Sequence, residues 1–110
     1  MSFSQRSEAL QWKAEFRFSS SERTYDCEIY IGPFPNSREL VIWRNEFIRD
    51  LISFCKLRKG IRIFLCREKT EEFQKTETLP LAFKEPRQVA RNFMICASRK
   101  LMHLVESQAA

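Results

Sequence analysis

The sequence predicts an α+β fold, in which two helices pack on a mostly antiparallel sheet of four to five strands. Two runs near the N-terminus alternate apolar and polar residues, which is the pattern of strands with one buried face. Two later segments repeat apolar residues at the spacing of an amphipathic helix. The expected order of elements is three strands, a helix, one or two further strands and a final helix.

The first two strands are expected at residues 10–18 and 25–31, separated by a polar, turn-prone stretch at residues 19–23. Each run places apolar side chains on one face and polar side chains on the other, so the two predict an antiparallel hairpin. Asp26 and Glu28 share the polar face of the second strand. We expect them to pair with basic side chains of the first strand and not to act as a catalytic carboxylate pair.

Residues 32–37 contain two prolines and are expected to form a loop, because proline donates no hydrogen bond to a sheet. Residues 38–43 admit two interpretations, the start of a helix or a third strand. Asn36 with Glu39 fits a capping box that would begin a helix at Ser37. Such a helix would place Arg44 on its buried face, where an unpaired guanidinium is costly, so we predict the strand.

A helix is expected to begin with Asn45 as its cap and to run to about residue 57. Gly60 stands where the left-handed residue after a helix end normally lies, and the basic residues before it complement the helix dipole. Residues 61–66 are apolar on both sides apart from Arg62. This pattern predicts a central strand that is covered on both faces or lies against another chain. The helix expected after Asn45 has an apolar stripe that consists of Phe47, Ile48, Leu51, Ile52 and Cys55.

Residues 67–78 are expected to be a solvated connection, and residues 79–83 an edge strand in which Pro80 is tolerated. Residues 86–106 repeat apolar side chains at helical spacing, and Pro86 suits the first turn of a helix. This element order also fits an oligonucleotide-binding type of small barrel with an added C-terminal helix, which is the alternative fold. The presence of only two glycines argues against a barrel, because its corners need glycine or bulges.

Residues 1–110 are expected to form one compact domain, with residues 1–8 as a flexible N-terminus. Ten phenylalanines and two tryptophans supply an apolar core, so the chain is expected to fold without a cofactor. No segment has the length of a membrane span or the pattern of a secretory signal. We therefore expect a cytoplasmic protein, or a nuclear one in a eukaryotic or viral setting, with no membrane partner.

The four cysteines are widely spaced and lack the CxxC pattern of a zinc knuckle. We expect reduced core thiols at Cys27, Cys55, Cys66 and Cys96. The single histidine, His103, falls near the end of the last predicted helix, where an imidazole suits the helix dipole. No nucleophile, metalloprotease or phosphate-loop motif is present. The sequence therefore predicts a non-enzymatic protein without a metal or cofactor.

The net charge of +5 is concentrated in one part of the sequence. The surplus falls at residues 36–67, while the flanking segments are close to neutral. Clustered arginines and lysines neutralise phosphates and release counterions, so we predict binding of nucleic acid, DNA or RNA, single- or double-stranded. The candidate rings for base stacking are Tyr30, Trp43 and Phe64. The predicted phosphate contacts are Arg44, Arg49, Lys56, Arg58, Lys59, Arg62 and Arg67.

The alternative function is that of a protein-protein interaction module, or of a small inhibitor or adaptor that docks on an acidic protein or a nucleoprotein. The predicted last helix also suggests a homodimer, because small residues beside large apolar ones can form a self-associating surface. That surface would consist of Phe93, Met94, Ala97 and Leu101.

Overall fold

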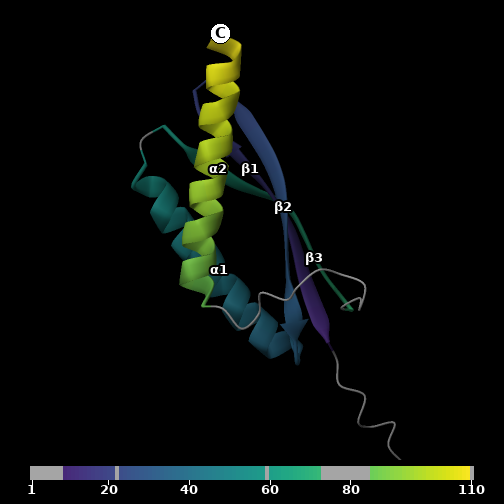
Figure 1. Ribbon diagram of the computed structural model, residues 1–110. Coiled ribbons are helices and arrows are strands. Elements are labelled where there is room, and N and C mark those ends of the chain that lie inside the picture. The colour runs from purple at the N-terminus through teal and green to yellow at the C-terminus, as the bar shows by residue number, and fades with distance from the viewer. Residues whose placement is uncertain (1–8, 22, 59, 73–84, 110) are drawn as a thin grey trace, which may run out of the picture.

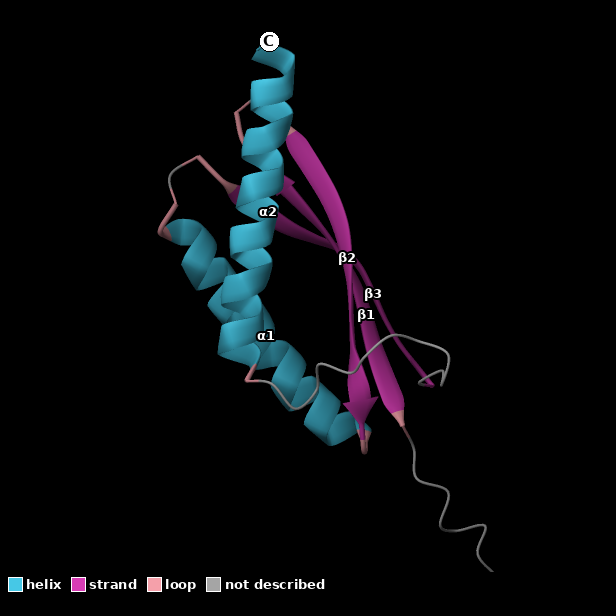
Figure 2. Cartoon of the chain, in the orientation of Figure 1, coloured by secondary structure: helices cyan, strands magenta, loops and turns pink. Residues whose placement is uncertain are grey.

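The computed structural model describes residues 9–21, 23–58, 60–72 and 85–109. The strands in this part of the chain form one antiparallel sheet in the order β2-β1-β3, and both helices cover the same face of it (Figure 1, Figure 2). The predicted α+β class is therefore confirmed, but the described residues form three strands and not the predicted four to five. The elements are β1 (Leu10–Ser19), β2 (Thr24–Phe34), α1 (Ser37–Lys56), β3 (Arg62–Glu72) and α2 (Pro86–Ala109).

β1 is the central strand, and one of its faces is buried against the helices. Trp12, Phe16 and Phe18 are at most 2% exposed on that face. β1 pairs with β2 in a register that sets Arg17 opposite Asp26 on the other face. The predicted antiparallel hairpin with one wet face is therefore confirmed.

β2 continues to Phe34, beyond the predicted end at residue 31, so the expected loop is shorter. The strand lies at an edge of the sheet. Pro33 can be accommodated there because the outer side of an edge strand forms no backbone hydrogen bonds with a neighbouring strand. Ile31 and Phe34 are both buried. The apolar contacts of these side chains with the core account for the extension of the strand.

α1 includes both the segment 38–43 and the predicted helix after it, so the prediction of a strand at residues 38–43 is wrong. The capping interpretation is correct, because the side-chain oxygen of Asn36 accepts a hydrogen bond of 2.9 Å from the N–H of Glu39. The helix does turn Arg44 toward the sheet. Its guanidinium is paired with Glu68 of β3, which removes the cost that burial of an unpaired charge would carry.

The strand predicted at residues 61–66 is longer than expected and lies at an edge of the sheet, not at its centre. β3 runs on to Glu72 through residues predicted to be a connection. Its side chains are exposed or half-buried throughout, with Phe64 50% and Leu65 36% exposed. Apolar residues on both faces of a strand therefore do not establish that the strand is central.

Two sequence predictions, the strand at residues 79–83 and the flexible segment at residues 1–8, lie outside the described residues. In the part of the chain that is described, β2 and β3 are the two edges of the sheet and do not pair with each other. The described strands thus form an open sheet and not the closed barrel of the alternative fold.

α2 confirms the helix predicted at residues 86–106 and extends to Ala109. The structure corrects the prediction that this helix offers a self-associating surface. Met94, Ala97 and Leu101 are at most 3% exposed, and Phe93 is half-buried against the core. Met94, Ala97 and Leu101 are almost fully covered by packing within the chain, and Phe93 is partly covered.

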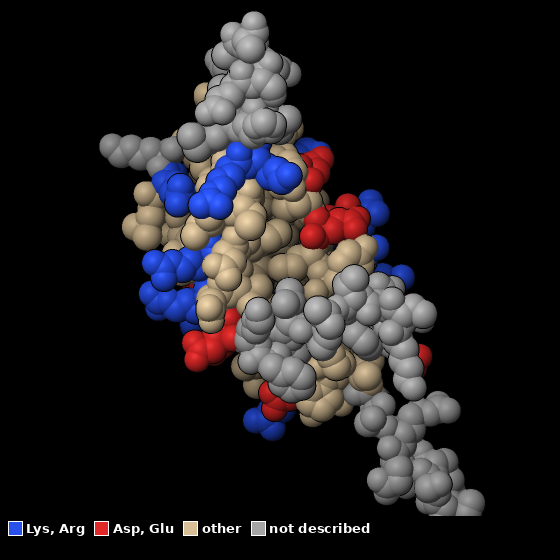
Figure 3. Space-filling view, viewed as in Figure 1, with Lys and Arg blue, Asp and Glu red and all other residues tan. Residues whose placement is uncertain are grey.

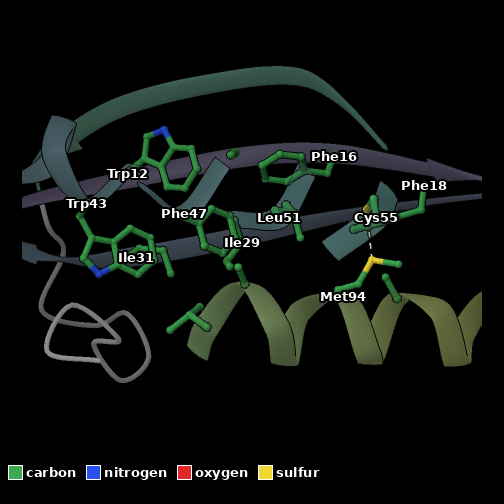
Figure 4. Packing of buried hydrophobic residues seen from close by; sticks show 14 of the residues in the cluster. Trp12, Phe16, Phe18, Ile29, Ile31, Trp43, Phe47, Leu51, Cys55 and Met94 are labelled. Atoms are coloured by element: carbon green, nitrogen blue, oxygen red, sulfur yellow. Dashed lines mark hydrogen bonds between the residues drawn. The ribbon is translucent and has the colours of Figure 1, made fainter. Parts of the chain in front are cut away.

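The core is organised around the ring of Phe47 in α1 (Figure 4). This ring stacks on Trp43 with centroids 5.2 Å apart. It also contacts Trp12, Phe16 and Phe93 at centroid distances of 5.7, 6.1 and 5.9 Å. Because these side chains come from β1, α1 and α2, one aromatic cluster fixes the helices on the sheet.

Candidate nucleic-acid interface

The cations predicted to contact nucleic acid do not form one surface. Lys59 lies outside the described residues, and Arg44 faces the space between α1 and β3. Arg62 and Arg67 lie on the open face of the sheet, away from the helices, because their register partners on β1 alternate with its buried residues. Arg49 is exposed on α1 and lies 3.6 Å from the carboxylate of its neighbour Asp50.

Arg44 and Glu68 form a two-pronged ion pair between α1 and β3. Glu68 faces the helices because it lies opposite the buried Ala14. Nε and Nη2 of Arg44 donate to Oε1 and Oε2 of Glu68 over 2.7 and 2.5 Å, and the indole N–H of Trp12 donates to Oε1 over 3.0 Å. The hydrogen bonds from Arg44 and Trp12 lower the pKa of Glu68. Arg44 is therefore a structural link and is not available to phosphates.

Replacing Glu68 by glutamine is expected to cost about 1 kcal/mol of folding free energy at neutral pH. The pKa of Glu68 is lower in the folded chain than in the unfolded chain, so the ion pair stabilises the fold above about pH 4.5. That contribution is lost as the pH falls through the folded-state pKa. Urea unfolding should show a larger difference between Glu68→Gln and the parent at about pH 7 than at about pH 3.

Glu72→Gln is the matched control, at an exposed position of the same strand. It should unfold like the parent at both pH values. An equal loss of stability for Glu68→Gln at both pH values would contradict the ion-pair account, because protonation removes the charge of Glu68 in acid.

On the open face of the sheet, basic side chains lie next to acidic side chains that balance their charge. Arg17 donates to Asp26 through Nε and Nη2 over 2.7 and 3.1 Å and lowers the pKa of that carboxyl. Nη1 of Arg67 lies 3.7 Å from Oε2 of Glu15. The predicted pairing of Asp26 with a basic residue of the first strand is confirmed. These opposite charges leave little positive surplus for phosphates on this face.

The three candidate stacking rings do not form a common platform. Trp43 is 7% exposed and stacks within the core. Tyr30 lies on β2, where its hydroxyl donates to Glu28 over 2.8 Å and Nζ of Lys13 lies 5.3 Å from its ring centroid. Phe64 is half-exposed on β3, at the opposite edge of the sheet.

The end of α1 places Arg58 beside α2. Leu57 is the C-cap, and the N–H of Arg58 donates to the carbonyl of Cys55 over 3.0 Å. Gly60 then takes a φ of +86°, which is the left-handed conformation expected of glycine after a helix. The predicted helix end is confirmed, and its turn holds Arg58 at the edge of a depression between the helices.

An open depression of about 460 Å³ lies between the end of α1 and the middle of α2. Arg58 lines it from the turn that follows α1, and Arg91 lines it from α2. None of the described lining residues is acidic, and neither arginine forms an ion pair with another described residue. We refer to this site as the Arg58–Arg91 depression. Its other lining residues are Phe54, Leu57, Met94 and Ile95.

Arg87 extends the cationic surface along α2. It lies one helical turn before Arg91, and its guanidinium carbon is 5.8 Å from the ring centroid of Phe54. This distance suits a cation–π contact. Arg87 and Arg91 line a second hollow, next to the depression, together with Glu85, Gln88, Asn92 and Ile95.

The sequence predictions missed Arg87 and Arg91. A signal for them was present, because no acidic residue occurs from Pro86 to Leu101. On the face shown in Figure 3, lysine and arginine side chains gather over the helical layer. The basic residues of this segment are Arg87, Arg91, Arg99 and Lys100, and all are exposed.

The structure corrects the expectation that all four cysteines are core thiols. Cys66 and Cys96 are exposed, so only Cys55 is fully buried and Cys27 partly so. Burial raises the pKa of Cys27 to about 12 and that of Cys55 to about 11, so both thiols stay protonated at neutral pH. Among the described residues, no group of three or more His, Cys, Asp or Glu side chains is arranged to hold a metal ion.

Comparisons of this chain with protein-family models, with curated proteins and with solved structures give no match. Within the described part of the chain, neither helix is long and apolar enough to cross a membrane. The chemistry of the Arg58–Arg91 depression therefore carries the functional inference.

Proposed function

We propose that this protein is a small, non-enzymatic, basic binding protein that contacts nucleic acid mainly through phosphates at the Arg58–Arg91 depression. The observation that carries the proposal is the meeting of Arg58 and Arg91 in one depression whose described lining contains no acid. Planar guanidinium groups bind phosphate oxygens through paired N–H donors. Two such groups, one from the turn after α1 and one from α2, fix the position of a phosphate backbone better than one flexible side chain.

Further cations raise the positive potential around the depression. Lys56 is exposed in the last turn of α1, and Arg87 lies next to the depression on α2. Contacts with phosphates give affinity without sequence choice, because they do not touch the edges of the bases. We therefore expect binding to depend weakly on base sequence and strongly on salt.

A protein-interaction module is the second candidate, and β3 is the observation that favours it. β3 is an edge strand with exposed Phe64 and Leu65. An exposed edge can pair with a strand of another chain or of a second copy. Nucleic acid ranks first because the Arg58–Arg91 depression has an unbalanced charge, whereas β3 carries charges of both signs.

Fluorescence anisotropy with labelled single- and double-stranded DNA and RNA tests the proposal. If Arg58, Arg87 and Arg91 each neutralise a phosphate, a plot of log Kd against log salt should have a slope of about 2 to 3. The affinity should then fall by about 20- to 40-fold between about 50 and 200 mM salt. Absent binding at low salt, or binding that salt does not weaken, would contradict the proposal. A dimeric mass by light scattering without nucleic-acid binding would favour the second candidate.

A further inference from the structure

We infer that the Arg58–Arg91 depression receives an unpaired nucleotide, so that the protein prefers single-stranded nucleic acid to a duplex. This inference rests on the proposed function and adds that the nucleic acid bound is single-stranded. It depends on the apolar part of the lining, which phosphate binding alone does not use.

The floor and edge of the depression are apolar between the two arginines. Met94 belongs to the buried core and Phe54 packs against it, while Ile95 is half-buried and Leu57 at the helix end is 80% exposed. Apolar surface gains nothing from a phosphate, but it gains from the face of a base. In a duplex the base faces are stacked inside, so only an unpaired nucleotide can cover this surface.

The aromatic ring at the depression is already paired with a guanidinium group. Arg87 lies over Phe54 at 5.8 Å, and together they present planar groups next to Arg58 and Arg91. Unpaired bases stack on aromatic rings and on guanidinium planes of this kind. Gln88 and Asn92, which line the adjoining hollow, carry amides that can donate to and accept from base edges.

The size and charge of the depression fit the same occupant. Its volume of about 460 Å³ is within the range of pockets that hold one small organic group. Its described lining offers guanidinium groups for the phosphates on either side of a base and no carboxylate to repel them. DNA and RNA share this chemistry, since no contact with a 2′-hydroxyl is needed.

The test compares one labelled oligonucleotide as a single strand and as a duplex, in DNA and in RNA, by fluorescence anisotropy. The wild-type protein should bind the single strand at least about tenfold more tightly than the duplex. Leu57→Ser should weaken single-strand binding by about five- to tenfold and leave duplex binding unchanged. Leu57 is exposed, so this change should not unfold the protein. Ile52→Ser is the matched control, at an exposed apolar position of α1 outside the depression, and should change neither affinity.

The outcomes separate this inference from the proposed function. Equal binding of both strand forms, a preference for the duplex, or an equal effect of Leu57→Ser on both would overturn the single-strand inference while the proposed function stands. Failure of the wild-type protein to bind either form would overturn the proposed function as well. A single-strand preference shared by DNA and RNA is expected, and a preference limited to RNA would contradict recognition through base faces and phosphates alone.

Discussion

Reversing two charges with Arg58→Glu and Arg91→Glu is expected to weaken nucleic-acid binding by at least about 30-fold at low salt. The change removes two phosphate contacts and adds two carboxylates that repel the backbone. The slope of log Kd against log salt should fall by about two, one for each lost contact. Both side chains are exposed, so urea unfolding should show a loss of stability of no more than about 1 kcal/mol, most of it from the acid placed near the negative end of α1.

The control variant is Arg67→Glu with Lys69→Glu, which makes the same change in net charge on the open face of β3. Lys69 lies opposite Lys13, so replacing it also removes a pair of like charges. This variant should lose less than about threefold in affinity, through the long-range potential alone. If it lost as much as the first variant, binding would not be located at the Arg58–Arg91 depression.

Replacing Phe47 by alanine is expected to destabilise the fold by about 3 to 5 kcal/mol. The side chain is fully buried, and its ring contacts rings from β1, α1 and α2. A domain of this size is stable by about 5 to 15 kcal/mol, so the variant should be close to the limit of folding. Urea unfolding followed by tryptophan fluorescence measures the effect, because Trp12 and Trp43 lie against this ring.

Two further variants keep this prediction testable if Phe47→Ala does not fold. Phe47→Leu retains much of the apolar volume and should show an intermediate loss of stability. Ile52→Ala, at a position 42% exposed on the same helix, should cost less than about 1 kcal/mol. Similar losses for Phe47→Leu and Ile52→Ala would mean that the aromatic cluster does not organise the core.

The start of α1 shows why the local sequence does not decide between a helix and a strand at residues 38–43. Asn36 and Glu39 carried the correct local signal, a helix cap. Burial of Arg44 argues against this signal until its partner is known, and that partner, Glu68, belongs to a strand that comes later in the chain. Whether a guanidinium is paired depends on tertiary structure, so the helix could not be separated from a strand by local rules alone.

The predicted central position of β3 in the sheet was wrong for a related reason. Alternation identifies a strand and its buried face, as it did for β1, but it does not give the order of strands in a sheet. β3 carries Phe64 and Leu65 on opposite faces and is nevertheless exposed at an edge. The apolar pattern that predicted a central position is also what makes β3 the candidate surface for a protein partner.

The candidate site was predictable in part. The charge pattern along the chain indicates Arg58, because the middle third holds the basic surplus. Arg87 and Arg91 were missed because the last third is close to neutral when counted as a whole. Its acids lie outside the segment 86–101, and a count within each predicted helix would have revealed a basic α2.

Amide chemical-shift mapping with a short single-stranded oligonucleotide tests most directly whether nucleic acid binds between the two helices. The isotope-labelled wild-type protein is titrated, so no variant needs to fold. The largest shifts are expected at residues 54–58 and 87–95, which carry the Arg58–Arg91 depression and its neighbouring hollow. Largest shifts on the open face of β1 and β2, or along β3, would contradict the location of the site.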